Sequence, residues 1–205
     1  MGKRIGRKRL YSLDKLGQSE TTLEPGPAMS GAYGHGKASR HGSEIITEIY
    51  VDLGAGQVFS GRSLPSGTII GHSGTNDSSA VQTAAAHIGR ITAEKAGLIN
   101  LVEMNCIEAP LGGVADIDLV AATSSALPFS GSGGLATKRD LFTVVNGGTA
   151  VKGSSAAAVL DNNQLGTYQY LYLACGGTPT SKAEYTAGKF VIRLFGIAEL
   201  DDVTN

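Results

Sequence analysis

The stretch from His87 to Val120 reads HIGRITAEKAGLINLVEMNCIEAPLGGVADIDLV. Its longer apolar run starts after Gly97 and alternates with period two. One face carries Leu98, Val102, Met104 and Cys106, and the other carries Glu103 and Asn105. This spacing is typical of a strand. Gly97 can supply the positive φ of a tight connection, and Pro110, which has no amide to donate, marks the strand's end. The stretch therefore predicts a β-hairpin that turns at Glu94 to Gly97.

Composition extends this reading to the whole chain. The 205 residues include 29 glycines and no tryptophan, and aromatic residues make up only 6%. Many turns and short strands are typical of such a composition, and a helical bundle is not. We expect an all-β fold, a β-sandwich or jelly-roll-like body of eight to ten short strands, over residues 44–205.

Further segments repeat the strand pattern. Ile45 to Leu53 alternates over about nine residues and ends at Gly54. Asp116 to Ala122 and Asp140 to Val145 are shorter candidates. Phe190 to Phe195 is apolar on both faces, as expected of an interior strand or a subunit contact.

Residues 1–43 differ from this body in charge. They contain eight Lys and Arg against three Asp and Glu, giving +5, so the remainder of the −1 chain carries −6. Leu23 to Ser43 holds Pro25, Pro27 and few aliphatic residues, and we expect it to be ordered only against a partner. The sequence predicts an extended basic arm that lies on an acidic surface of a neighbouring subunit, stays solvated, or contacts nucleic acid, the least favoured of the three. Its expected contact residues are Lys3, Arg4, Arg7, Lys8, Arg9, Leu10, Tyr11, Leu13 and Leu16.

The two cysteines, Cys106 and Cys175, are too few for a disulfide framework. We expect both to be small buried hydrophobes, with a single bridge between them as the alternative. No apolar run approaches the roughly 18 residues that cross a bilayer, and the basic start lacks the apolar segment of a secretory signal. The expectation is a soluble protein made in a cytoplasm, with no membrane partner.

Stretches that resemble catalytic motifs fail on context. His72 and Ser73 stand between glycines, but a nucleophile elbow needs a strand-to-helix turn. Gly131 to Ala136 matches a loose dinucleotide-loop pattern, but no strand precedes it. Four acids, Glu103, Glu108, Asp116 and Asp118, lack calcium-loop spacing, and the four histidines are dispersed. We therefore expect no catalytic residues, no metal and no cofactor. The enzyme alternatives are a hydrolase using Ser73 and His72 or a polysaccharide-degrading protein using Glu103 with Asp116.

Three tyrosines, Tyr168, Tyr170 and Tyr172, alternate with Gln169, Leu171 and Leu173. Three phenolic rings on one face are a candidate subunit or glycan contact, and a satellite core is the alternative.

Four segments together resemble a known group of proteins. They are ITEIYVDLG (Ile46 to Gly54), the stretch from His87 to Val120 with its E-M-x-C-x-E-A-P element, YQYLYLACGG, and YTAGKFVIRLFG (Tyr185 to Gly196). The sequence resembles small virion structural proteins of marine tailed bacteriophages over most of residues 44 to 197. The E-M-x-C-x-E-A-P element and the TAGKFVI strand are its most specific parts, and the basic arm is outside it.

The resemblance implies a non-enzymatic component of a virion. We expect a capsid decoration or cement protein, a homo-oligomer whose body sits on the head shell and contacts the major capsid protein or other virion proteins. A small β domain that has no pocket-forming group of residues and makes rigid sheet contacts suits a shell component present in many copies. A receptor- or glycan-binding module is the alternative from a different class.

Overall fold

A computed structural model describes residues 33–41, 43–55, 58–59, 69–70, 87–123, 129–130, 134–135, 142–160, 165, 168, 170–176 and 184–198. The basic cluster of residues 3–16 lies outside these ranges. So do His72 and Ser73.

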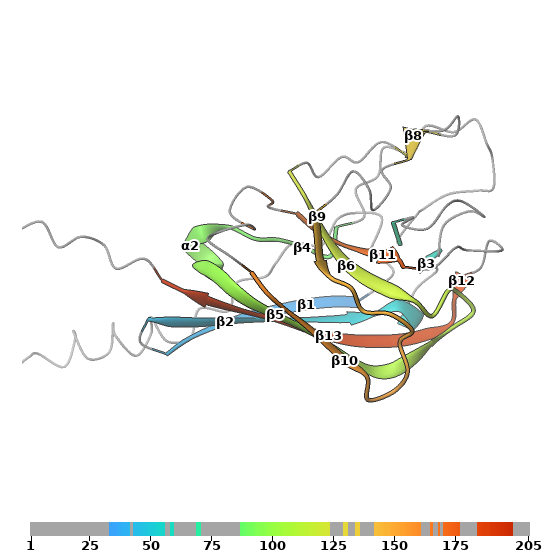
Figure 1. Cartoon of the computed structure of the whole chain (residues 1–205). Coiled ribbons are helices and arrows are strands. Elements are labelled where there is room, and N and C mark those ends of the chain that lie inside the picture. Colours follow the sequence, from blue (N-terminus) through green and yellow to red (C-terminus); the bar gives the residue numbers. More distant parts are fainter. Residues whose placement is uncertain are drawn as a thin grey trace, which may run out of the picture.

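Two antiparallel sheets dominate the structure, which confirms the all-β prediction (Figure 1). The larger sheet has the order β1 (Tyr33–His41), β2 (Glu44–Asp52), β13 (Ala187–Ile197), β5 (Leu98–Leu111) and β10 (Ser155–Val159). The smaller sheet has the order β4 (Gly89–Arg90), β11 (Tyr170–Cys175), β6 (Ile117–Ala122) and β9 (Phe142–Val145). The sheets form two layers in Figure 1. The jelly-roll alternative remains a prediction.

The remaining described elements are short. Two-residue strands pair as β12 (Glu184–Tyr185) with β3 (Val58–Phe59), and as β7 (Phe129–Ser130) with β8 (Gly134–Leu135). One helical turn, α2 (Ala93–Ala96), precedes β5, and a 3-10 turn, η2 (Leu53–Ala55), follows β2.

One apolar core joins the two layers. β2 and β13 alternate as predicted: Ile49 and Val51 are buried from β2, and Phe190, Ile192 and Leu194 from β13. In the smaller sheet, every residue of β6 and nearly every residue of β11 is buried. A strand buried on both faces is apolar on both, so its sequence does not distinguish a core face from a solvent face.

The predicted hairpin at Glu94 to Gly97 is wrong. β4 pairs with β11 in the smaller sheet, whereas β5 pairs with β13 and β10 in the larger one. The connection is the single turn of α2, in which the amides of Lys95 and Ala96 bond to the carbonyl of Thr92 at 3.0 and 2.9 Å. Gly97 has the positive φ that was predicted, 65°. Periodicity identified the strands, but it carries no information on which strands pair.

Bulges in β5 correct the predicted face. Val102, Met104 and Cys106 are buried as expected, but Ile99 is buried in place of Leu98. Phe195 pairs with Leu101 and Gly196 with Ile99, so Asn100 is an extra residue that changes the phase of the strand. A bulge of this kind reverses which side chains face the core.

The larger sheet begins earlier than predicted. β1 pairs with β2 along its whole length, from Tyr33 opposite Asp52 to His41 opposite Glu44. Residues 33–41 therefore belong to the sheet and not to the predicted arm of residues 1–43. The expected partner of this glycine-rich segment is β2 of the same chain. Few aliphatic residues are sufficient there, because a strand at a sheet edge can be held by backbone hydrogen bonds.

Candidate docking face

The outer face of the larger sheet has an ordered arrangement of side chains. Because β2, β13 and β5 point alternate residues into the core, the intervening residues point away from it. The strand register places these outward residues in rows that cross the sheet. We call this surface the docking face. It consists of the outward residues of β2, β13, β5 and β10.

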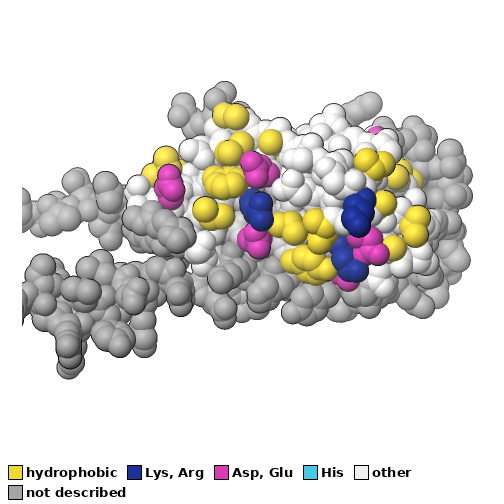
Figure 2. Space-filling model, turned by 90° about the horizontal axis from the view of Figure 1, so that it is seen from below, with side chains coloured by type: hydrophobic (Ala, Val, Ile, Leu, Met, Phe, Trp, Pro, Cys, Tyr) yellow, Lys and Arg dark blue, Asp and Glu magenta, His cyan; other side chains and the backbone are white. Residues whose placement is uncertain are grey.

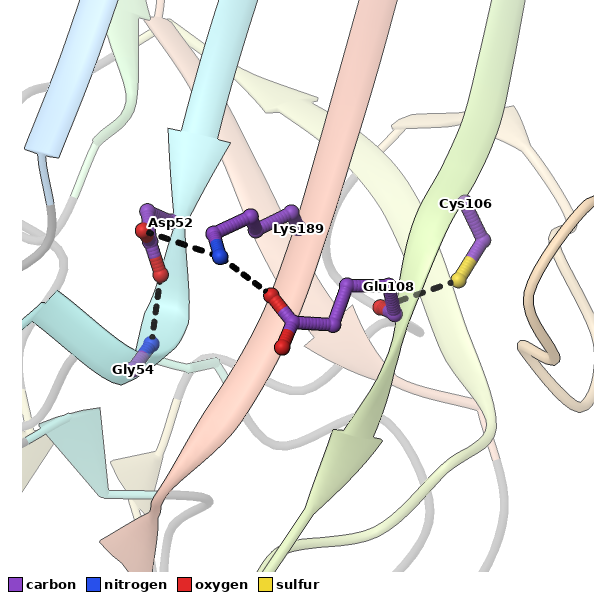
Figure 3. A network of polar contacts seen from close by, with 5 residues as sticks. All are labelled: Asp52, Gly54, Cys106, Glu108 and Lys189. Carbon is purple, nitrogen blue, oxygen red and sulfur yellow. Dashed lines mark hydrogen bonds and ion pairs between the residues drawn. The ribbon is translucent and has the colours of Figure 1, made fainter.

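Two of the rows are charged. In the first, Lys189 lies between Asp52 and Glu108, which flank it on the neighbouring strands (Figure 3). The hydrogen bond with Glu108 raises the pKa of Lys189 above its ordinary value. In the second row, Arg193 Nε donates to Glu48 Oε2 at 2.8 Å, and Glu103 stands opposite Arg193 on the other side.

The charged rows are further fixed at one end of the sheet. Asp52 Oδ1 accepts a hydrogen bond from the amide of Gly54 at 3.0 Å, which ties the carboxylate to η2 (Figure 3). On β5, the thiol of Cys106 donates to the backbone carbonyl of Glu108 at 3.2 Å. These contacts order the backbone beneath the row, whereas the exposed ion pairs themselves contribute little stability.

Apolar rows alternate with the charged ones. Tyr50 stands opposite Val191, and Ile46, Phe195, Leu101 and Val159 form a row across four strands. Val159 is 79% exposed and Ile197, in the next row, is 47% exposed. Figure 2 shows hydrophobic side chains spread between basic and acidic ones over this side of the molecule. A rigid surface that mixes apolar and charged rows is suited to protein contacts.

A depression borders the first charged row. Seven residues line it: Ile107, Glu108, Ala109, Leu111, Lys152, Ala187 and Lys189. It has a volume of about 440 Å³ and is open to solvent, with Leu111 60% exposed at its side. A depression that is open to solvent leaves part of a small ligand exposed, and it can also accept a side chain of a protein partner.

The predicted acidic residues fall in two places. Glu103 and Glu108 lie on the docking face, whereas Asp118 is fully buried in the smaller sheet and Asp116 precedes it. In the proposed acid/base pair, Glu103 is therefore on the larger sheet, whereas Asp116 lies just before β6 of the smaller sheet. Within the described ranges, no three His, Cys, Asp or Glu side chains are grouped to hold a metal ion.

Both cysteines are free and buried, as predicted. Burial raises the pKa of Cys175 to about 11, and the neighbouring carboxylates of Asp116 and Asp118 act in the same direction. Burial also raises the pKa of Tyr185, whose hydroxyl donates to the carbonyl of Val114 at 2.8 Å. The Cys175 thiol is neutral and interior, so it stabilises the fold and does not provide a nucleophile.

The tyrosine row is not a continuous exposed surface. Tyr172 is fully buried, and burial raises its pKa. His87 packs edge-on against Tyr170 and Tyr172, at ring-centroid distances of 5.1 and 6.1 Å. Tyr168 stacks on Phe142 at 5.1 Å. Only Tyr168 and Tyr170 keep partial exposure, which favours the satellite-core alternative for Tyr172.

Comparisons with known proteins give no further guide. No protein-family model, no curated protein and no solved structure matches the chain. In the described part of the chain, no helix is both long enough and apolar enough to cross a membrane.

Sequence reasoning did not find the docking face. Its signal was present in Phe190 to Phe195, where Val191 and Phe195 stand on the opposite face from the core residues. The rows could not be recognised because they depend on the register of β2, β13 and β5, which are far apart in the sequence.

Proposed function

We propose that the protein is a structural component of a bacteriophage virion, a decoration or cement protein that binds the head shell through its docking face. The alternating apolar and charged rows on the larger sheet carry this proposal. The resemblance of residues 44 to 197 to virion structural proteins of marine tailed phages supports the choice of partner, the major capsid protein. Many copies on one shell add avidity, so a shallow contact at each copy is sufficient.

Substitutions on the docking face test the proposal. Val159→Asp places a charge in the longest apolar row, at a side chain so exposed that the fold does not depend on it. Burying a valine at an interface contributes about 1.5 to 3 kcal/mol, so binding to shells that lack the protein should weaken by about tenfold or more. Thr123→Asp, at an exposed position after β6, is the matched control and should bind normally. Equal shell binding by both variants would contradict the proposal.

A glycan-binding role is the second candidate. It is supported by Arg90, whose guanidinium carbon lies 5.7 Å from the centroid of the partly exposed Tyr170 ring. A ring with a neighbouring donor can stack on a sugar and bond to its hydroxyls. Loss of cell adsorption in Tyr170→Ala, with shell binding unchanged, would favour this role over decoration.

A further inference from the structure

We propose that the docking face of the free protein binds the basic segment of residues 3–16 of the same chain. In this proposal the segment binds the docking face before any capsid protein does. It goes beyond the decoration role, since it concerns the protein before it meets any shell.

The charges of the two parts are complementary. The segment has six basic residues, Lys3, Arg4, Arg7, Lys8, Arg9 and Lys15, against one acid, Asp14, giving +5. The described side chains of the docking face include five carboxylates, Glu44, Glu48, Asp52, Glu103 and Glu108, against Lys189 and Arg193. Lys152 at the depression reduces this acidic excess without reversing it.

Two carboxylates are available for a basic partner. Glu44 and Glu103 make no ion pair with another described residue, whereas Glu48 and Glu108 are already paired. They stand in the two rows on either side of the row that contains Ile46, Phe195 and Leu101. A ligand for this part of the face needs apolar side chains between cationic ones.

The segment has that composition. Its basic cluster, Arg7 to Arg9, runs directly into Leu10 and Tyr11, and Leu13 and Leu16 follow. Apolar contacts to the exposed rows and charge-assisted contacts to Glu44 and Glu103 can therefore form together.

The tether has a suitable length. Sixteen residues, 17–32, join the segment to Tyr33, where β1 enters the sheet opposite Asp52. For sixteen residues, the random-chain relation gives a root-mean-square end-to-end distance of about 20 to 24 Å. From Tyr33, Glu103 lies three strands across the sheet and four residues along it, roughly 20 Å away, and Glu44 lies one strand across and eight residues along, roughly 27 Å away. Both carboxylates are within reach of a tether of this span, so the effective concentration of the segment at its own face is on the order of millimolar.

The same comparison disfavours a second copy as the occupant. At micromolar protein, a segment on another molecule is far more dilute than the tethered one. Two docking faces packed against each other would bring two surfaces of the same acidic excess together. The tethered basic segment avoids both costs.

Zero-length carbodiimide coupling of the full-length protein tests the proposal. Amines of Lys3, Lys8 and Lys15 should couple to Glu44 or Glu103, and peptide mass spectrometry should identify the linked pairs. Raising the salt from 50 to 500 mM shortens the screening length to a few ångströms, so the yield should fall about tenfold. An equal mixture of ¹⁴N and ¹⁵N protein should give links within single copies.

Variants complete the test. Glu103→Lys should reduce the remaining Glu44 links about tenfold, and Ala157→Ser, at the exposed position paired with Glu103, should leave them unchanged. Glu103→Lys changes the face itself, so a double variant of the segment, Arg7→Glu with Lys8→Glu, tests the same contact from the other side. It should also reduce the links to Glu44. Links between ¹⁴N and ¹⁵N copies, no links to Glu44 or Glu103, or links indifferent to salt and to both variants would each overturn the proposal.

Discussion

The backbone amide of Gly147 donates a hydrogen bond to Oδ1 of Asp118 at 2.9 Å. Asp118 is fully buried on β6, and Gly147 belongs to the turn after β9, so the contact joins that turn to the interior of the smaller sheet. A buried carboxylate is retained only when it is hydrogen-bonded, and its loss leaves the partner amide without an acceptor.

Asp118→Ala should lower the free energy of unfolding by about 1.5 to 3 kcal/mol, which is the contribution of a hydrogen bond to a charged group. Urea denaturation followed by circular dichroism gives the value. Asp52→Ala is the control, because Asp52 is at the surface and should cost at most about 1 kcal/mol. Equal losses in the two variants would mean that the buried contact is not important.

Gly196→Ala should destabilise the protein more than Gly153→Ala. A Cβ on Gly196 would collide with the backbone carbonyl of Ala96 in α2, which cannot move without disturbing the start of β5. Gly153 has open space around it, but its φ of +86° disfavours an L residue by about 1 to 2 kcal/mol. We expect a loss of about 3 kcal/mol or more at Gly196, as for severe overpacking. Thermal unfolding of both variants checks the order.

The pattern of residues predicted strands better than it predicted their partners. Ile45 to Leu53 was placed almost to the residue, because one face of β2 is buried and alternation follows directly. The hairpin at Glu94 to Gly97 failed because an apolar run next to a glycine is equally compatible with a crossover between sheets. β1 was missed because its stability comes from backbone bonds to β2, which leave no mark on side-chain composition.

The candidate site was less predictable than the fold. The acids were considered as a metal or acid/base group because of their proximity in sequence, but Glu103 and Asp118 ended on different sheets. Conversely, Glu48 and Arg193 form an ion pair across 145 residues of chain, which no local pattern can indicate.

Tyr172→Ala should lower stability by about 3 to 5 kcal/mol, as expected for removal of a fully buried aromatic ring. Tyr170→Ala should cost clearly less, because that ring keeps partial exposure. Denaturant midpoints of the two variants make the comparison. Should Tyr172→Ala unfold no more easily than Tyr170→Ala, the tyrosine row would be a surface feature after all, and the glycan-binding role would gain support.

Alkaline pH should destabilise the protein through Cys175. Burial raises the pKa of this thiol from 9.0 to about 11, so between these values the folded chain keeps a proton that the unfolded chain releases. The stabilisation is therefore fully present below pH 9 and is lost as the pH rises to 11. One pKa unit corresponds to about 1.4 kcal/mol, so the free energy of unfolding should fall by roughly 3 kcal/mol over this range.

Cys175→Ala isolates this contribution. The variant should show little change in stability between pH 9 and 10, and a decline only above about pH 10, where the buried Tyr172 and Tyr185, whose pKa values are also raised, begin to matter. Cys106→Ala is the matched control and should keep most of the wild-type slope, since Cys175 is the more deeply buried thiol. Urea titrations at half-unit pH steps measure the slopes.

In native wild-type protein at pH 8, both thiols should react with a thiol reagent far more slowly than after unfolding, because both are buried and protonated. Rapid native labelling of Cys175, or a wild-type slope that survives in Cys175→Ala, would show that the thiol is not the group that titrates.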